Sequence, residues 1–273
     1  MSFPVAIQVY SVRGDASKDL RGTLEQIKEM GYDGVEFAGL YGYEPAQIKK
    51  WCDSLGLAPI SAHVPLAEML ADVDKVIADY KAVGCEYIVV PYVTEERRPG
   101  GELFLQMVEE IRAIGEKAKA AGLVLLYHNH DFEFNKLENG QTGLDYLYEN
   151  VPADFLQTEL DQCWVKYAGY EPVEYLQKYS GRSPVVHLKD FYKAGEQEGD
   201  PYALIGIDEG EKKENTAFES RPVGYGIQDI PAIIAAAKEA GSKWLVVEQD
   251  NPSMGKTPFE SVQMSMEYLE SLK

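Results

Sequence analysis

Short apolar runs alternate with amphipathic stretches along the whole chain. The apolar runs have the length of buried strands, and the stretches that follow them have apolar residues at helical spacing. In 18–30, for example, Leu20, Leu24 and Ile27 share one face, and Ser17 is placed to cap the first turn. The pattern predicts strands at 5–9, 34–37, 58–63, 87–90, 123–127, 155–160, 185–188 and 243–248, and helices at 18–30, 45–55, 72–83, 102–121, 143–149, from Pro172, at 229–240 and at 258–272.

The regular alternation of strand and helix predicts parallel βαβ units. Eight such units in about 250 residues have the size of a closed (β/α)₈ barrel, a TIM barrel. An open doubly wound sheet is the alternative, but no Gly-x-Gly-x-x-Gly motif follows the first strand. Polar residues end strands from both halves of the chain, and only closure brings all these ends to one mouth. We therefore predict a single α/β TIM-barrel domain over residues 1–273.

One segment of the second half lacks this periodicity. Between Asp190 and Gly226 the chain becomes polar and rich in glycine, most clearly over 195–215. Long aperiodic segments in compact domains are often binding loops or lids. The sequence predicts an exposed insertion or lid at about 190–226.

Polar side chains are concentrated at the predicted carboxyl ends of the strands. The densest group is His128-Asn129-His130-Asp131-Phe132-Glu133, directly after the apolar run 123–127. Such groups are costly to bury unless a metal or substrate satisfies them. Other strands end in the same way, at Glu36, His63, Asp161, His187 and Glu248.

Four of these residues form a candidate metal site. Three carboxylates and one imidazole would meet at the mouth of a closed barrel, where like charges need a cation between them. The mixed oxygen and nitrogen set suits one divalent ion, with Mn²⁺, Mg²⁺, Co²⁺ and Zn²⁺ as candidates, and the excess of carboxylates favours the harder ions. Taken singly, each residue could instead belong to a salt bridge, a loop cap or a satisfied core histidine. The predicted ligands are Glu133, Asp161, His187 and Glu248.

Composition and charge narrow the class of partner. The chain has 26 basic and 45 acidic residues, a formal net charge of −19. A negative field of this size repels nucleic acid and anionic membranes. Three cysteines without metal or redox spacing, no signal peptide and no long apolar span predict a soluble cytoplasmic protein that binds neither nucleic acid nor membrane.

The motifs resemble those of the sugar phosphate isomerase/epimerase superfamily, the xylose isomerase-like TIM barrels. The most specific are Tyr127-His128-Asn129-His130-Asp131-Phe132-Glu133-Phe134, Glu159-Leu160-Asp161 with Trp164, and His187-Leu188-Lys189-Asp190. Val247-Glu248 and Arg221-Pro222-Val223-Gly224-Tyr225-Gly226 complete the match over essentially the whole chain. The resemblance implies one divalent metal, most often Mn²⁺, bound by the four residues above, and a small-molecule carbohydrate as substrate. It also suggests a homo-dimer or homo-tetramer.

The resemblance and the residues together suggest further roles. Glu248 is the candidate base, Glu133 a second candidate catalytic residue, and His128 and His130 are candidate proton carriers because their ordinary pKa suits neutral pH. Lys189 could polarise a substrate oxygen or neutralise a carboxylate, and Trp164 could wall the pocket or simply pack. The predicted substrate-binding residues are His63, Lys189, Arg221, Trp164 and Glu36.

The predicted chemistry begins with removal of a proton next to a substrate carbonyl, through an enediolate stabilised by the metal. Proton return would make the protein an isomerase or epimerase of a ketose or related keto sugar. Expulsion of a β-oxygen would instead make it a dehydratase or lyase acting on a keto-inositol or 3-keto-glycoside. A non-catalytic sugar-binding barrel and an endonuclease of the AP type are the remaining hypotheses.

One departure from the ketose 3-epimerases favours the second alternative. Those enzymes have a glutamate at the end of strand five, where this chain has Tyr127, and its glutamate comes later, at Glu133. The variant resembles the inosose dehydratase and keto-glycoside branches of the superfamily. It puts in question whether a strand-five glutamate acts as the base here.

Overall fold

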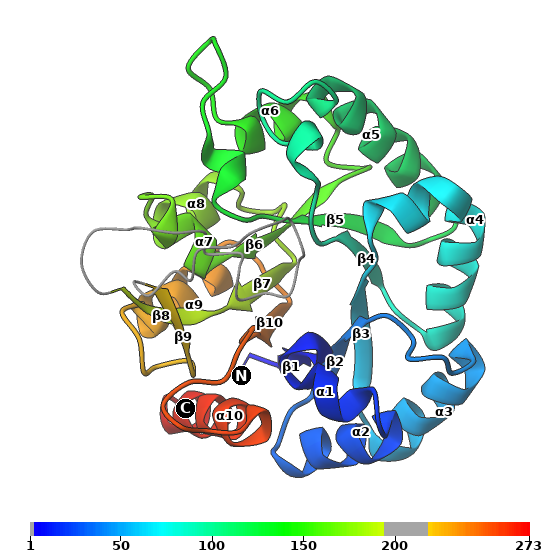
Figure 1. Ribbon diagram of the computed structural model, residues 1–273, viewed down its shortest axis with the longest axis vertical. Helices are drawn as coiled ribbons and strands as arrows, with labels where there is room; N and C mark the ends of the chain where they lie inside the picture. The colour runs from blue at the N-terminus through cyan, green and yellow to red at the C-terminus, as the bar shows by residue number, and fades with distance from the viewer. Residues whose placement is uncertain (1–2, 194–217) are drawn as a thin grey trace.

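A closed barrel of eight parallel strands forms the centre of the molecule (Figure 1). The computed structural model describes residues 3–193 and 218–273. Pairing of β1 with β10 closes the ring, in the order β1-β10-β7-β6-β5-β4-β3-β2. The predicted TIM barrel is therefore confirmed. The barrel strands are β1 (Val5–Gln8), β2 (Gly34–Ala38), β3 (Ala58–His63), β4 (Tyr87–Val90), β5 (Val124–His128), β6 (Gln157–Asp161), β7 (Val185–Leu188) and β10 (Trp244–Val247).

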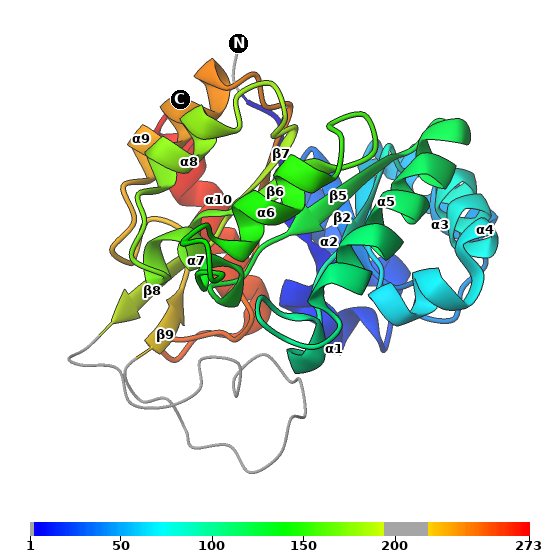
Figure 2. The same cartoon turned by 90° about the horizontal axis from the view of Figure 1, so that it is seen from above.

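Helices surround the barrel on its outside (Figures 1 and 2). The predicted helices are present, with ends that shift by a few residues. They are α2 (Leu20–Glu29), α3 (Pro45–Leu55), α4 (Leu66–Val83), α5 (Phe104–Ala120), α6 (Gly143–Asn150), α8 (Pro172–Lys178), α9 (Ile230–Glu239) and α10 (Pro258–Ser271). Shorter elements are α1 (Arg13–Ala16), α7 (Gln162–Tyr167) and the 3₁₀ turns η1 (Val9–Val12), η2 (Glu95–Arg97) and η3 (Phe132–Phe134).

Local sequence signals explain several helix ends. Thr257 and Glu260 form a capping box at the start of α10. Helix α3 has Pro45 in its first turn and ends at Gly56, whose φ of 64° is favourable only for glycine and a few polar residues. The prediction that Ser17 caps the helix before Met30 was wrong. Asp19 is the cap instead, accepting a hydrogen bond from the Gly22 N–H, because α1 and its turn occupy the residues before it.

Helix α4 begins earlier than the sequence predicts. Its backbone leaves helical geometry at Asp72, where φ is −158° and ψ is 79°, so Leu66–Ala71 forms a separate helical segment before the predicted helix. Asp72 accepts a hydrogen bond from the Lys75 N–H and so caps the second segment. The periodicity marked only this second part, and the first lies near the carboxyl end of β3.

The aperiodic segment begins and ends in a β-hairpin that the sequence did not predict. Strands β8 (Asp190–Lys193) and β9 (Phe218–Arg221) pair antiparallel at one end of the barrel (Figure 2). Phe191 and Phe218 are buried and stack with ring centroids 5.3 Å apart. Both ends of the predicted insertion are thus packed against the barrel. Residues 194–217, on which most of the lid prediction falls, lie outside the described residues.

The inside of the barrel is filled by a layer of mainly apolar side chains near the amino-terminal ends of its strands. It is separate from the larger core that the helices form with the outer faces of the strands. This layer closes the amino-terminal part of the barrel, so polar chemistry is confined to the carboxyl ends of the strands. Its members are Ala6, Ile60, Tyr87, Val89, Leu126, Val185 and Val246.

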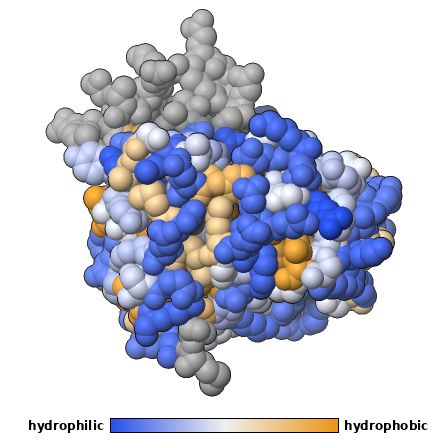
Figure 3. All heavy atoms as spheres, turned by 90° about the horizontal axis from the view of Figure 1, so that it is seen from below, coloured by the Kyte–Doolittle hydropathy of each residue, from blue (hydrophilic) through white to orange (hydrophobic). Residues whose placement is uncertain are grey.

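One face of the molecule illustrates how the many charged residues of the chain are distributed on the surface. The face shown in Figure 3 is covered largely by hydrophilic residues, with a narrower apolar strip across its middle. Within residues 3–193 and 218–273, no helix combines the length and the apolar character needed to cross a membrane.

Candidate active site

Charged and imidazole side chains replace the apolar layer at the carboxyl ends of the strands. On β5, β7 and β10 they stand two residues beyond Leu126, Val185 and Val246, and therefore on the same inward face. All of these side chains are buried except that of His63, which is slightly exposed. The group consists of Glu36, His63, His128, Glu159, Asp161, His187, Lys189, Glu248 and Asp250.

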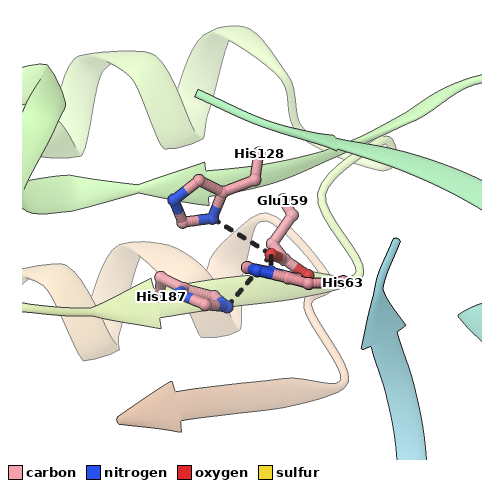
Figure 4. A group of neighbouring side chains, drawn as sticks. All are labelled: His63, His128, Glu159 and His187. Carbon is pink, nitrogen blue, oxygen red and sulfur yellow. Dashed lines mark hydrogen bonds and ion pairs between the residues drawn. The ribbon is translucent and has the colours of Figure 1, made fainter. Parts of the chain in front are cut away.

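Glu159 of β6 lies among three histidines. Its Oε1 atom is 2.7 Å from His63 Nε2 and 3.0 Å from His187 Nε2. It is also 3.1 Å from His128 Nδ1, and Figure 4 shows the three rings around this carboxylate. Burial alone would raise the pKa of Glu159, but the histidines hold it well below its usual range. Glu159 is therefore an ionised carboxylate that orients three imidazoles.

The His187 ring has carboxylates at both nitrogens. Nε2 lies 2.8 Å from Glu36 Oε1, and Nδ1 lies 3.0 Å from Glu248 Oε2. Burial lowers the pKa of His187, but Glu159 and Glu36 more than offset this and raise it well above its usual range. In metal sites, a histidine commonly binds the ion through one nitrogen and donates the other N–H to a carboxylate. His187 has the partners for this arrangement.

Asp161 has one oxygen engaged and one available. Its Oδ1 accepts hydrogen bonds from the backbone N–H groups of Cys163 and Trp164 and so caps α7. Its Oδ2 is buried and accepts no hydrogen bond from any described residue. The basic nitrogen atoms nearby are His128 Nε2 at 3.6 Å and Lys189 Nζ at 3.7 Å. A buried carboxylate oxygen without a donor is well suited to bind a cation.

Two overlapping groups of side chains could hold a metal ion. In each, one potential ligand atom per residue lies within 4.8 Å of all the others. Each group contains a buried carboxylate oxygen without a hydrogen bond among the described residues, Asp161 Oδ2 in the first and Glu159 Oε2 in the second. We take the first group as the candidate ion site because it contains three of the four predicted ligands. The first group is His128, Asp161, His187 and Glu248, and the second is His63, His128, Glu159 and His187.

Glu133 lies outside both groups, although the sequence predicts it as a ligand. Its Oε1 accepts a hydrogen bond from the Tyr127 hydroxyl at 2.7 Å, and its Oε2 accepts one from the His130 N–H at 2.7 Å. Burial raises the pKa of Glu133 to about 8. These bonds hold Glu133 in the turn after β5, and the candidate ion site contains His128 rather than Glu133. The separation of Glu133 from the strand end explains the difference.

Lys189 is a buried ammonium group surrounded by carboxylates. Its Nζ lies 2.8 Å from Asp250 Oδ2, 3.3 Å from Glu248 Oε2 and 3.7 Å from Asp161 Oδ2. Burial lowers its pKa, but Asp250, Glu248 and Asp161 raise it well above the usual value. The ammonium is thus retained, 5.2 Å from the centre of the Trp164 ring.

His130 differs from the other histidines in its charge. Burial and the neighbouring His128 and Lys189 lower its pKa well below the usual value, so the ring is neutral at pH 7. The ring stacks on Phe132 with centroids 5.3 Å apart and meets Tyr92 edge-on at 5.2 Å. His130 is therefore a rigidly held neutral imidazole, and its lowered pKa differs from the ordinary value on which its predicted role as a proton carrier rested.

A cavity of 560 Å³ opens onto this group. Its volume is in the range of small-molecule sites. Of the predicted site residues, it reaches His63, His128, His130, Lys189 and Glu248, and it also reaches Asp250 and Tyr10. The barrel closure thus brings predicted residues from four strands, β3, β5, β7 and β10, to one pocket.

Three predicted substrate-binding residues do not line this cavity. Glu36 accepts hydrogen bonds from Gln8 and Ser61 and lies beneath the histidines. Trp164 is buried, and its ring stacks on Phe218 at 5.6 Å. Arg221, on β9, contacts Glu219 Oε2 at 2.8 Å. Each has a partner within the protein, and their binding of substrate stays a prediction.

Glu159 and Asp250 belong to the group of charged and imidazole side chains at the strand ends, although neither residue was predicted from the sequence to have a binding or catalytic role. Both could have been found from the sequence. Glu159 lies two residues before the predicted ligand Asp161, and Asp250 lies two residues after the predicted ligand Glu248. Residues two apart along a strand point to the same side of the sheet. Asn129 was also missed. Its side-chain oxygen accepts the Asp161 N–H at 3.0 Å, and its amide donates to the Asp161 carbonyl at 3.3 Å. This pair fixes the ends of β5 and β6 relative to each other.

Comparison with known proteins identifies the relatives of this chain. The family model described as xylose isomerase-like TIM barrel matches residues 24–272. An inosose dehydratase of Geobacillus kaustophilus is 22% identical over 91% of this chain and 86% of its own length. Among solved structures, a sugar phosphate isomerase/epimerase of Parabacteroides distasonis superposes with a TM-score of 0.76 at 22% identity, covering 99% and 94% of the two chains. The IOLI protein with a zinc atom gives 0.73 at 18% identity, covering 98% and 97%.

Proposed function

The chain belongs to the xylose isomerase-like TIM barrel family, and we propose that it is a metal-dependent dehydratase or lyase of keto sugars or keto-inositols. In this reaction a proton leaves the carbon next to a carbonyl, and a β-hydroxyl or β-alkoxy group is then expelled. The inosose dehydratase relative supports the proposal at the level of reaction class. The single observation that carries it is the position of Lys189 beside the candidate ion site.

His128, Asp161, His187 and Glu248 would hold the ion. Two imidazole nitrogens and two carboxylate oxygens make a softer set than the one predicted from sequence, which shifts the preference from Mg²⁺ toward Zn²⁺, Co²⁺ or Mn²⁺. When bound, a divalent ion polarises the substrate carbonyl and acidifies the neighbouring C–H bond. The zinc atom in the IOLI protein shows that one structural relative binds such an ion.

Lys189 would supply the proton for the departing oxygen. Elimination needs an acid near the leaving group, since an alkoxide leaves far less readily than an alcohol. The three carboxylates keep the ammonium of Lys189 protonated, and the residue lines the cavity. Simple epimerisation needs no such donor.

Glu248 is the proposed base. Lys189 lowers the pKa of its carboxyl well below the usual range, opposing the effect of burial, so Glu248 is ionised. After the reaction Glu248 would hold the substrate proton and Lys189 would be neutral. Their contact, 3.3 Å between Oε2 and Nζ, gives a direct path for returning this proton to Lys189. The cycle then closes without an outside proton donor.

An isomerase or epimerase is the second candidate. His130 and Glu248 both line the cavity, and their strands, β5 and β10, are separated in the barrel by β6 and β7. Two proton-transfer groups on different sides of a substrate are what epimerisation requires. This candidate shares the first proton removal with the dehydratase and lyase.

Reaction in D₂O separates the two candidates. With 3-keto-glycosides, keto-inositols and ketoses as substrates, we expect mass spectrometry to show loss of alcohol or water. In Lys189→Gln, elimination should fall by about 10²–10⁴-fold while deuterium uptake at the carbon next to the carbonyl continues. The loss should be larger for poor leaving groups than for good ones.

The surface variant Lys178→Gln, which removes a lysine paired with Asp145, is the matched control. Thermal unfolding of both variants would check that the fold is retained. Deuterium uptake in the wild type with no change in composition would contradict the elimination and identify an isomerase or epimerase. No uptake and no product with the metal-loaded protein would reject both candidates.

A further inference from the structure

The cavity has two chemically different sides. Its floor is formed by the polar side chains at the strand ends, and His63, His130 and Lys189 are among the residues that line it. Its outer wall is mainly apolar and comes from the segments that follow β3 and β4. Its apolar residues are Pro65, Leu66, Ala67, Leu70, Pro91 and Val93, and the same segments also contribute Glu68, Tyr92, Thr94 and Arg97 to the lining.

Only part of the apolar wall belongs to the hydrophobic core, which includes Leu66 and Val93. Leu70 leaves 41% of its surface exposed, although it is a large apolar residue, and Pro65 and Ala67 are also exposed. These three residues belong to the segment around Leu66–Ala71 that precedes the break of α4 at Asp72. Leu66 and Met69 of this segment pack into the core, while its exposed residues Pro65, Ala67 and Leu70 line the cavity.

The lining of the cavity provides few cationic side chains that could pair with an anionic substituent of the substrate. Lys189 and Arg97 are the lysine and arginine side chains among the described residues that line the cavity. Lys189 is held by carboxylates, and Arg97 forms an ion pair with Glu110. A phosphate would need a cation that is free to pair with it. The lining therefore favours a neutral, apolar group.

We infer that the substrate carries an apolar substituent, and that this substituent binds between the segments after β3 and β4. The inference rests on the proposed function, because it places the sugar or cyclitol ring on the polar floor. A free keto-inositol has hydroxyl groups on every side and would leave the wall in contact with water, with no gain from the apolar surface. A sugar with an aromatic or alkyl aglycone would cover both sides of the cavity.

The inferred apolar substituent also specifies which products the elimination would give. If the apolar group is attached through the oxygen that leaves, the products are an unsaturated keto sugar and the free apolar alcohol or phenol. Carbon–oxygen bond cleavage is balanced by the proton that Glu248 removes and the proton that Lys189 delivers. No oxidant or reductant is consumed in this step. The ketone itself must come from a preceding oxidation of the sugar.

Binding of unreactive glycosides tests the subsite independently of turnover. We expect calorimetry to show that phenyl β-glucoside binds the metal-loaded wild type at least about tenfold more tightly than methyl β-glucoside. Leu70→Ser should abolish most of this preference while methyl β-glucoside binding changes by less than about twofold. Leu105→Ser is the matched control, since Leu105 is 61% exposed on α5 and does not line the cavity.

The outcomes separate the subsite from the reaction. A phenyl preference that depends on Leu70 would support the subsite even if no glycoside were turned over. Elimination from phenyl and methyl 3-keto-glucosides with equal kcat/KM and equal binding would overturn the subsite and leave the proposed function intact. A change of oligomeric state in Leu70→Ser, with unaltered glycoside binding, would overturn the inference by assigning the wall to a subunit interface.

Discussion

A single carboxylate, Glu159, determines the positions of three histidine rings. It is ionised and buried, and it contacts His63, His128 and His187. Two of these rings belong to the candidate ion site. Carboxylates that orient metal-binding histidines contribute to metal affinity without touching the metal. Glu159 contacts two candidate ligands in this way, His128 and His187.

Replacing Glu159 should therefore weaken metal binding. We expect Glu159→Gln to lower the affinity for Zn²⁺ and Mn²⁺ by about 10–100-fold, because an amide cannot stabilise the imidazole N–H groups as a carboxylate does. Competition with a chromophoric chelator measures this directly, with no need for an activity assay. Glu171→Gln, which alters an exposed glutamate paired with Lys166, is the control. Equal affinity in wild type and Glu159→Gln would show that the carboxylate does not orient the ligands.

At the scale of elements, the helices approach the barrel closely at defined points. Gly115 of α5 is one of them. A Cβ atom at this position would lie 2.1 Å from the backbone oxygen of Phe155, just before β6. The contact is with backbone, so a flexible side chain cannot move aside. The absence of a side chain at Gly115 thus sets how closely α5 packs on the segment that leads to Glu159 and Asp161.

A pair of helical glycines tests this packing. Gly115→Ala should destabilise the protein by about 1–3 kcal/mol through overpacking, despite the better helix propensity of alanine. Gly14→Ala, in α1, places its Cβ where no atom lies within 4 Å and should be neutral or slightly stabilising. Urea unfolding followed by circular dichroism measures both. A Gly115→Ala protein as stable as Gly14→Ala would mean that α5 can shift outward freely.

The sequence predicted the strands and helices of the barrel better than it predicted the arrangement of side chains in the candidate active site. The barrel strands were predictable because buried parallel strands are continuous apolar runs, as in Tyr87–Val90. The hairpin β8–β9 was not, since its strands are short and only Phe191 and Phe218 give an apolar signal. His128 was predicted to act in proton transfer, but its position among the candidate ligands depends on side-chain directions at a strand end. Local pattern does not specify those directions.

At the scale of the whole molecule, buried acids couple stability to pH. Glu133 keeps its proton in the folded state up to a pH of about 8, whereas the unfolded chain releases it near the ordinary value of 4.5. Between these values the folded state binds more protons than the unfolded state. The contribution of Glu133 to stability therefore decreases as the pH rises through this window.

The variant Glu133→Gln should remove this part of the pH dependence. Relative to the wild type, it should gain roughly 1.4 kcal/mol for each pH unit between 5 and 8, because glutamine cannot ionise. Urea unfolding of chelator-treated protein at several pH values measures the difference. Glu138→Gln, in the turn before α6, serves as control. A constant difference between wild type and Glu133→Gln over this range would show that Glu133 titrates normally.

The pairing of β1 with β10 has a consequence for how the protein is made. Glu248 follows β10, while Glu36 and His63 come from β2 and β3, so the contacts of His187 with Glu36 and Glu248 join distant parts of the chain. Such high contact order slows folding. During synthesis, the sheet keeps open edges at β1 and β7 until β10 has left the ribosome. The emerging chain must therefore stay soluble with two unpaired strand edges until β10 pairs with them and the residues of the candidate ion site come together.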